Sequence, residues 1–268
     1  MTDFEKEFEP TRRDYSRRNA YWLGMAANAA YKDSGPARAE VAAWGLNDFV
    51  PFSKKSGLAV DTQGFFAANP QCVLLAFRGT QPNQVRDWMT DLHCTFTGGP
   101  VGQVHAGFHV ALSSVWNDVW NWVAENRRGR PLFVTGHSLG AALACLAVAR
   151  LRLERDEPVQ GLYTFGQPRT GDRDFARAFD QDFEKQAFRY VNNNDVVTRV
   201  PLRSMSYSHV GDLRYFREDG RQDDVMSWWD KLKDRLSGRL HDLLAPGTDG
   251  LKDHSMDRYV ENLKKNKT

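Results

Sequence analysis

The stretch LFVTGHSLG, residues 132–140, decides the fold, because an apolar run ends there at a serine flanked by two glycines. The apolar residues predict a short buried strand, and LGAALACLAVARLRLER from Leu139 predicts a buried helix. G-x-S-x-G between a strand and a helix is typical of a nucleophile elbow, a sharp turn that presents a strained serine. Ser138 is therefore predicted to be a nucleophile. The alternative, that Ser138 only caps the helix, accounts for one glycine but not for two.

The rest of the chain alternates strand-like apolar runs with helix-like segments. Such alternation predicts an α/β fold with a central, mostly parallel sheet flanked by helices. Helices are expected at 11–31 and 111–126. Residues 57–79 are expected to form two strands joined by a turn, and further strands are expected at 161–165, 187–191 and 210–216. Because no repeat or linker divides the 268 residues, one domain over 1–268 is expected.

The acid that would accompany Ser138 is expected at the end of a later strand. A nucleophile elbow is followed in the chain first by an acid and then by a histidine. Asp195, in FRYVNNNDVVTRVP, stands in a polar turn after a predicted strand, where ligand sites of parallel sheets form. Its main competitor is Asp172 in FGQPRTGD, which a helix-capping turn explains more simply. We therefore predict Asp195 as the acid.

The general base is expected among the histidines after Asp195. His254, in DHSMDRYV, lies in a loop before the last helix, and a loop can deliver an imidazole to a site. His254 is therefore the predicted base. Strand alternation is expected to turn His137 away from Ser138. Structural roles are expected for five other histidines: His105, His109, His137, His209 and His241.

An oxyanion hole is predicted from two backbone N–H groups. The first belongs to Leu139, the residue after the nucleophile, and the second comes from a loop after an earlier strand. FRGT at residues 77–80 ends such a strand, and Thr80 offers both an N–H and a hydroxyl. The alternative for Thr80 is an ordinary turn residue.

A lid is predicted for residues of about 81–97. In TQPNQVRDWMTDLHCTFTGG, apolar residues recur at helical spacing between Thr80 and a glycine pair, Gly98 and Gly99, which could serve as a hinge. The face of this short amphipathic helix is formed by Val85, Trp88, Met89 and Leu92. If this lid opens, its apolar face would make transient contact with a lipid interface. The alternative is an ordinary surface helix whose apolar side stays packed.

Composition argues against several other classes of function. The net charge is +2, and the basic clusters at the chain ends do not have the concentrated basic face or the binding motif that nucleic-acid binding requires. No apolar run reaches the ~20 residues of a transmembrane segment. The three cysteines show no metal-binding spacing, so no metal is expected. Because no apolar signal region begins the chain, a cytoplasmic location is the default expectation, with export by another route left open.

Several motifs together resemble the class 3 lipases, the family of filamentous-fungal triacylglycerol lipases. They occur in the family's order between residues 73 and 259: LAFRGT, VHAGFHVAL, VTGHSLGAALA, TFGQPRTGD, NNNDVVTRVP, YSHVG and DHSMDRY. The resemblance implies an α/β-hydrolase fold and the triad Ser138, Asp195 and His254. It also implies an oxyanion hole from Thr80 and Leu139, a lid after Thr80, and support of the Thr80 hydroxyl by Asp91 once the lid opens.

Two features depart from the secreted fungal members. The chain carries neither their disulfides nor an export signal. The segment at 223–244 is longer and more charged than expected. An apolar helical stripe in this segment consists of Val225, Trp229, Leu232, Leu236, Leu240 and Leu243. The stripe would either pack on the rest of the domain or form a second flap that contacts lipid.

The predicted function is hydrolysis of carboxylic esters of lipids through an acyl-enzyme, with a lipid or small ester as substrate and no cofactor. Feruloyl esterase or phospholipase activity on the same machinery remains open, because pocket shape cannot be derived from these motifs. A catalytically silent lipid-binding protein is the alternative of another class, because fold does not fix function.

Overall fold

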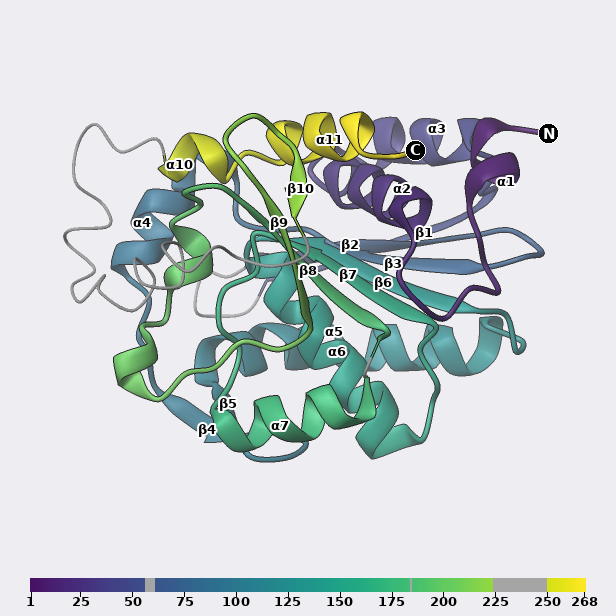
Figure 1. The fold of residues 1–268 in the computed structure, drawn as a ribbon. Helices are drawn as coiled ribbons and strands as arrows, with labels where there is room; N and C mark the ends of the chain where they lie inside the picture. The colour runs from purple at the N-terminus through teal and green to yellow at the C-terminus, as the bar shows by residue number, and fades with distance from the viewer. Residues whose placement is uncertain (56–60, 184, 224–249) are drawn as a thin grey trace.

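The structure is a computed structural model that describes residues 1–55, 61–183, 185–223 and 250–268. A central sheet lies between two layers of helices (Figure 1). In the described ranges, eight strands form this sheet in the order β1-β2-β3-β6-β7-β8-β9-β10. They are β1 Asp48–Lys55, β2 Asp61–Ala68, β3 Val73–Phe77, β6 Leu132–His137, β7 Gly161–Phe165, β8 Ala187–Asn192, β9 Asp212–Phe216 and β10 Gln222–Asp223. A separate hairpin pairs β4 Phe96–Gly98 with β5 Gln103–His105.

The centre of the sheet is parallel, as predicted. Strands β3, β6, β7, β8 and β9 pair in parallel, whereas β1 and β2 on one side and β10 on the other pair antiparallel. Every residue of β3, β6, β7 and β8 is buried, because helices cover both faces, which explains their nearly continuous apolar sequences. The segments that follow β3, β6, β7 and β8 therefore meet at one edge of the sheet.

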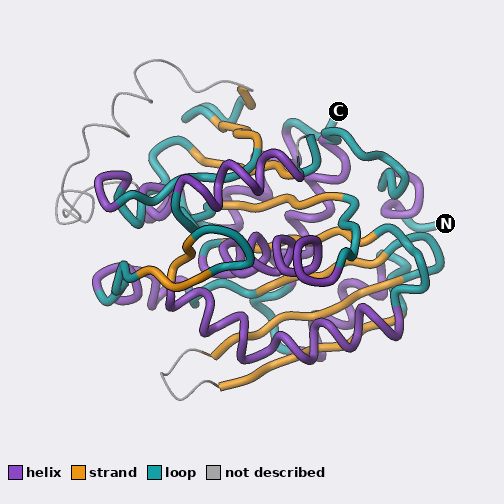
Figure 2. Tube along the Cα trace, turned by 90° about the horizontal axis from the view of Figure 1, so that it is seen from below, coloured by secondary structure: helices purple, strands orange, loops and turns teal. Residues whose placement is uncertain are grey.

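The helices form one layer on each face of the sheet. The first layer holds α1 Asp3–Glu7, α2 Arg17–Ala29, α3 Ser34–Ala43 and α11 Met256–Lys265, and the second holds α5 Ala106–Asn126, α6 Leu139–Arg155 and α7 Arg173–Asp182. Figure 2 shows helices running alongside the strands. The shorter helices are η1 Pro82–Gln84, α4 Val85–Thr90, η2 Val197–Arg199, η3 Arg203–Met205 and α10 Gly250–Asp253. Among the described helices, none combines the length and apolarity needed to cross a bilayer.

Capping residues explain where two helices depart from their predicted limits. The helix expected from residue 11 begins at Arg17, because the Ser16 hydroxyl accepts the N–H of Asn19 at 3.1 Å. The helix expected from residue 111 begins earlier, at Ala106, because the His105 ring caps it. The apolar stripe expected between Val225 and Leu243, together with His241, lies outside the described residues.

Candidate active site

Ser138 occupies a sharp, strained turn between β6 and α6. Its φ of 57° and ψ of −128° lie in a region that non-glycine residues rarely adopt. Its N–H donates to the Phe165 carbonyl at 3.0 Å, which ties the turn to the end of β7. The side chain makes no capping bond to α6 and is fully buried. The helix-cap alternative therefore does not describe this serine.

The two glycines of the turn are required by close packing. A Cβ on Gly136 would lie 2.3 Å from the carbonyl oxygen of Gly140, and a Cβ on Gly140 would lie 2.4 Å from that of Phe77. Both distances are far below any normal contact, so a larger residue would push the turn away from the end of β3. The sequence pattern thus reflects a close approach of β3, β6 and the start of α6.

Asp195 and His254 form a buried pair at the same edge of the sheet. Asp195 follows β8 in a turn and His254 lies between α10 and α11, and they are 1% and 3% exposed. The Nδ1 atom of His254 is 3.0 Å from Oδ1 and 2.9 Å from Oδ2 of Asp195. The carboxylate also accepts the Val197 N–H at 2.9 Å and the Tyr259 hydroxyl at 2.7 Å. These donors fix the carboxylate, which in turn orients the imidazole.

Ser138 Oγ and His254 Nε2 are both buried and lack a hydrogen-bond partner among the described residues. Because Nδ1 donates to a carboxylate, the neutral imidazole carries its lone pair on Nε2. Ser138 and His254 are not hydrogen-bonded to each other in this state, and such bonds often form only when substrate is bound. An unpaired hydroxyl and an unpaired imidazole nitrogen are the groups that a proton transfer from serine to histidine requires.

His137 contacts the predicted base, which the sequence analysis did not anticipate. Its ring stacks on that of His254, with centroids 4.4 Å apart. Its Nε2 donates to the His254 carbonyl at 2.7 Å, and its Nδ1 accepts the Tyr31 hydroxyl at 2.6 Å. Burial lowers the pKa of His137 well below its usual range, which keeps the ring neutral. His137 therefore supports the position of His254, and only its contacts in the folded chain show this role.

The competing residues have structural roles. Asp172 caps α7, since its Oδ1 accepts the Phe175 N–H at 2.8 Å. This is the helix-capping role that the sequence analysis preferred for Asp172 over a catalytic one. His105 caps α5 by accepting the Phe108 N–H at 3.3 Å, and burial lowers its pKa to about 4. Burial and the nearby Arg189 lower the pKa of His209 well below its usual range.

Thr80 lines two cavities that lie on either side of α4. One, of about 270 Å³, is also lined by His254, Val85 and Met256. The other, of about 380 Å³, is also lined by Leu139, Trp88 and Asp91. Both predicted oxyanion residues therefore border space that a substrate could enter.

The predicted lid segment is packed down over the acid-bearing loop. In α4, Val85 and Met89 are buried against Val196, Val197 and Val200. Trp88 in α4 and Leu92 after it are partly buried.

The glycine pair expected as a hinge, Gly98 and Gly99, lies in the β4–β5 hairpin. Gly98 pairs with Gln103 in the β4–β5 hairpin, and the Gly99 N–H donates to the Gly102 carbonyl at 3.0 Å. Because the hairpin fixes the glycine pair, residues 91–95, which form no helix or strand, are the segment that could bend.

Comparison with known proteins identifies the family. A model described as Lipase (class 3) matches residues 74–205. The secreted mono- and diacylglycerol lipase A of Penicillium cyclopium is 31% identical over 210 residues, which cover 71% of this chain and 67% of that protein. The chain belongs to the class 3 lipase family. Triacylglycerol lipase OBL1 of Ricinus communis is 24% identical over 278 residues, covering 72% of this chain and 53% of that lipase.

Solved class 3 lipases share the fold. Lipase II from Rhizopus niveus superposes with a TM-score of 0.66 at 26% identity, over 89% of this chain and 92% of that one. The lipase from Rhizopus microsporus var. chinensis has a TM-score of 0.62 at 28% identity, over 82% and 83%. The α/β-hydrolase fold implied by the sequence motifs is therefore confirmed.

The expected cytoplasmic location is wrong. Relatives in Penicillium cyclopium and Malassezia restricta are named secreted lipases. The expectation rested only on the first residues of the given sequence, and these do not locate a member of this lipase family.

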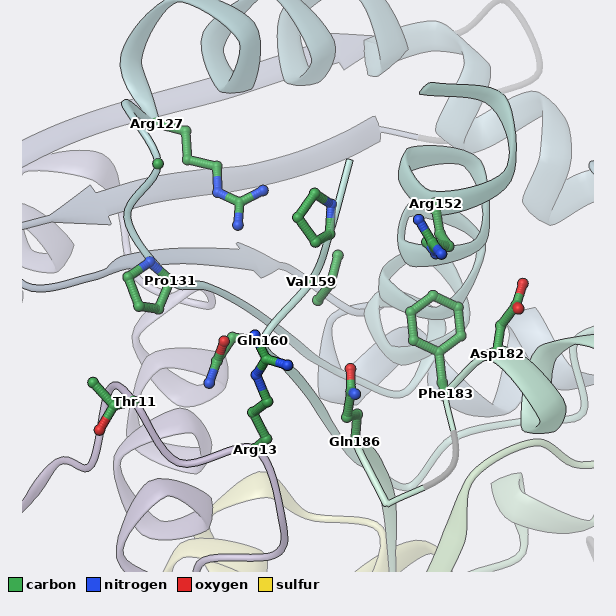
Figure 3. Close-up of a pocket in the computed structure, with 12 residues that line it drawn as sticks. Thr11, Arg13, Arg127, Pro131, Arg152, Val159, Gln160, Asp182, Phe183 and Gln186 are labelled. Carbon is green, nitrogen blue, oxygen red and sulfur yellow. The ribbon is translucent and has the colours of Figure 1, made fainter. Parts of the chain in front are cut away.

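Another cavity lies where β6, β7 and β8 begin, whereas Ser138 follows the end of β6 (Figure 3). It measures about 550 Å³ and is lined by residues that precede β6, β7 and β8, among them Pro131, Gln160 and Gln186. None of the predicted triad or oxyanion residues lines it. Its basic side chains include Arg127, which already pairs with Glu157. Cavity size alone therefore does not locate the site of this lipase.

Gly166→Ala should disable the site while leaving the fold in place. Gly166 has a φ of 58°, and a Cβ there would lie 2.8 Å from Asp195 Oδ2 and from His254 Nδ1. Because displacement by about 1 Å can cost about 10²-fold, we expect kcat/KM on a soluble ester to fall by that order. Gly35→Ala is the matched control, since its Cβ would meet nothing within 4 Å. Wild-type kcat/KM in folded Gly166→Ala would contradict the geometry described above.

Proposed function

We propose that this chain hydrolyses carboxylic esters of acylglycerols through an acyl-enzyme intermediate. The observation that carries the proposal is the pair of buried, unpartnered atoms, Ser138 Oγ and His254 Nε2, beside a fixed Asp195. Membership of the class 3 lipase family supports it. A lipid-binding protein without activity would have no need for a strained serine at this position.

In the proposed mechanism, Ser138 Oγ attacks the ester carbonyl while His254 Nε2 takes its proton. Asp195 holds the Nδ1–H and stabilises the imidazolium that forms. The alcohol leaves with the proton from His254, and a water molecule then attacks the acyl-enzyme with His254 again as the base.

The developing oxyanion would be held by the N–H groups of Leu139 and Thr80. Leu139 is the first residue of α6, so its N–H has no acceptor within the helix and lies at the positive end of the helix dipole. Thr80 lies after β3, next to Gly79, whose Cβ would be 3.0 Å from the Ser138 Cβ. The backbone of this loop therefore runs close to the nucleophile. Asp91 borders the same cavity as Thr80 and could support its hydroxyl when α4 moves.

We further propose that the chain works as one domain in which residues of about 81–97 act as a lid. Helix α4 separates the two cavities that share Thr80. Moving α4 would join them and expose Val85 and Met89, which are 4% and 0% exposed. In water this exposure is unfavourable by about 25 cal/mol per Å², whereas a lipid surface would cover the exposed face. A lipid interface should therefore select the open state.

Trp88→Ser should weaken activation by an interface. The wild-type rate on a short-chain triacylglycerol should jump as the substrate passes its solubility limit, and the variant should show a smaller jump because less apolar surface is gained on opening. The control is Trp120→Ser, which changes another partly buried tryptophan, on α5. Smooth saturation in the wild type would contradict the lid and favour an esterase with a permanently packed α4.

The substrate class is tested by acylglycerols and a phospholipid that carry the same acyl chain, together with a feruloyl ester. We expect hydrolysis of mono-, di- and triacylglycerols, and little turnover of a phospholipid or of a feruloyl ester. Absence of turnover across the panel, with a folded protein that still binds lipid vesicles, would overturn the proposed hydrolysis. Preference for phospholipid or feruloyl ester would keep the machinery but replace the substrate class.

A further inference from the structure

Asp253, the residue before His254, is a buried carboxylate outside the triad. It is 2% exposed. Its Oδ2 accepts the backbone N–H of Asn194 at 3.1 Å and the side-chain amide of Asn193 at 3.4 Å. Its Oδ1 pairs with the guanidinium of Arg258. Burying a carboxylate is costly unless it is paired and hydrogen-bonded, and each of these donors offsets part of that cost.

These bonds join two loops that are distant in the sequence. Asn193 and Asn194 belong to the turn after β8 that carries Asp195, whereas Asp253 ends α10 and precedes His254. The backbone carbonyl of Asp253 also accepts the Asn192 side-chain amide at 3.1 Å. Asp253 therefore contacts three successive residues: the last residue of β8 and the first two of the acid-bearing turn.

Further contacts continue this connection into α11. The side-chain oxygen of Asn192 accepts the Asn262 amide at 3.1 Å, and the Asn192 N–H donates to the Tyr259 hydroxyl at 2.9 Å. Tyr259 then donates to Asp195 itself. In this network, Asp253 contributes a carboxylate bonded directly to the backbone next to the acid.

We propose that Asp253 is a positioning residue for the Asp195–His254 pair. Its carboxylate fastens the turn that carries the acid to the loop that carries the base, so that His254 Nδ1 stays within 3.0 Å of Asp195. Since proton transfer tolerates displacements of only about 0.5 Å, loosening this connection should lower kcat more than substrate binding. The inference rests on the proposed function.

The test compares three single variants of the full chain on a soluble ester. Asp253→Ala should lower kcat by about 10- to 100-fold, with KM within about threefold of wild type. Asp253→Asn keeps an oxygen that can accept the Asn194 N–H, so kcat should stay within about fivefold. Arg258→Ala removes only the partly exposed partner of the carboxylate and should stay within about threefold. If Asp253→Ala does not fold, Asp253→Ser serves instead, because a serine is too short to reach Asn194.

A double variant separates positioning from general damage. In an Asp195→Ala background, Asp253→Ala should cause little additional loss of kcat, because its effect passes through the acid. A loss that multiplies with that of Asp195→Ala, or a wild-type kcat in folded Asp253→Ala, would overturn the inference.

Ser138→Ala is assayed alongside these variants. If Ser138→Ala retains turnover, the proposed function falls and the inference falls with it. If Ser138→Ala is inactive but Asp253→Ala is not impaired, only the inference falls.

Discussion

Ser138→Ala should leave the fold intact and reduce ester turnover by roughly 10⁴-fold or more. The hydroxyl is the only group removed, and it has no hydrogen-bond partner among the described residues, so its loss breaks no such contact. Alanine would still have to adopt the φ of 57° seen at Ser138, so the free energy of unfolding should change little from wild type. The measurement is kcat on a soluble ester, combined with a thermal melt.

The control for this variant is Ser114→Ala. Ser114 lies on α5, where its hydroxyl bonds to the Ala111 carbonyl at 2.7 Å, and it should retain wild-type kcat. Near-normal turnover in Ser138→Ala would remove the basis for the acyl-enzyme mechanism.

His254→Ala should lose activity by roughly 10⁴-fold, whereas His209→Ala should mainly lower the melting temperature. His254 presents an unpaired Nε2 and is oriented by Asp195. His209 is half-buried just before β9, and desolvation together with the charges of Arg189 and Arg169 lowers its pKa well below the usual range. The two variants therefore separate loss of a base from loss of packing. The reverse result, an active His254→Ala and an inactive but folded His209→Ala, would show that the base is wrongly assigned.

Local sequence was sufficient to predict the strand, elbow and helix around Ser138. The reason is physical: a sharp turn requires two glycines, and each has a close neighbour in the structure. The order serine, acid, histidine then pointed to Asp195 and His254, which the fold brings together at the carboxyl edge of the parallel strands. These features depend on spacing along the chain, and spacing is visible in a sequence.

The contacts that support the site could not be predicted in the same way. Tyr31 reaches the site from the turn after α2, Tyr259 from α11 and Asp253 from α10. No local pattern distinguishes these residues from other polar residues of the chain. His137 was expected to face away from Ser138, and alternation along β6 gave no indication that its ring stacks on His254. Such contacts depend on how distant elements pack.

The lid segment shows a similar limit. Helical spacing identified Val85 and Met89 as one apolar face, and both are buried in α4. The pairing of β4 with β5, which includes Gly98, was not foreseen, because it is a contact between segments that only the fold reveals. The interfacial rate measurement tests the movement of α4.

The most direct test of the account is labelling with a fluorophosphonate, which reacts only with an activated serine. After proteolysis, mass spectrometry should find the adduct on the peptide that contains Ser138 in the wild type. The adduct should be absent from Ser138→Ala and should form far more slowly in His254→Ala. An unlabelled Ser138 in folded wild-type protein, or an adduct on another serine that persists in Ser138→Ala, would contradict the assignment of this nucleophile.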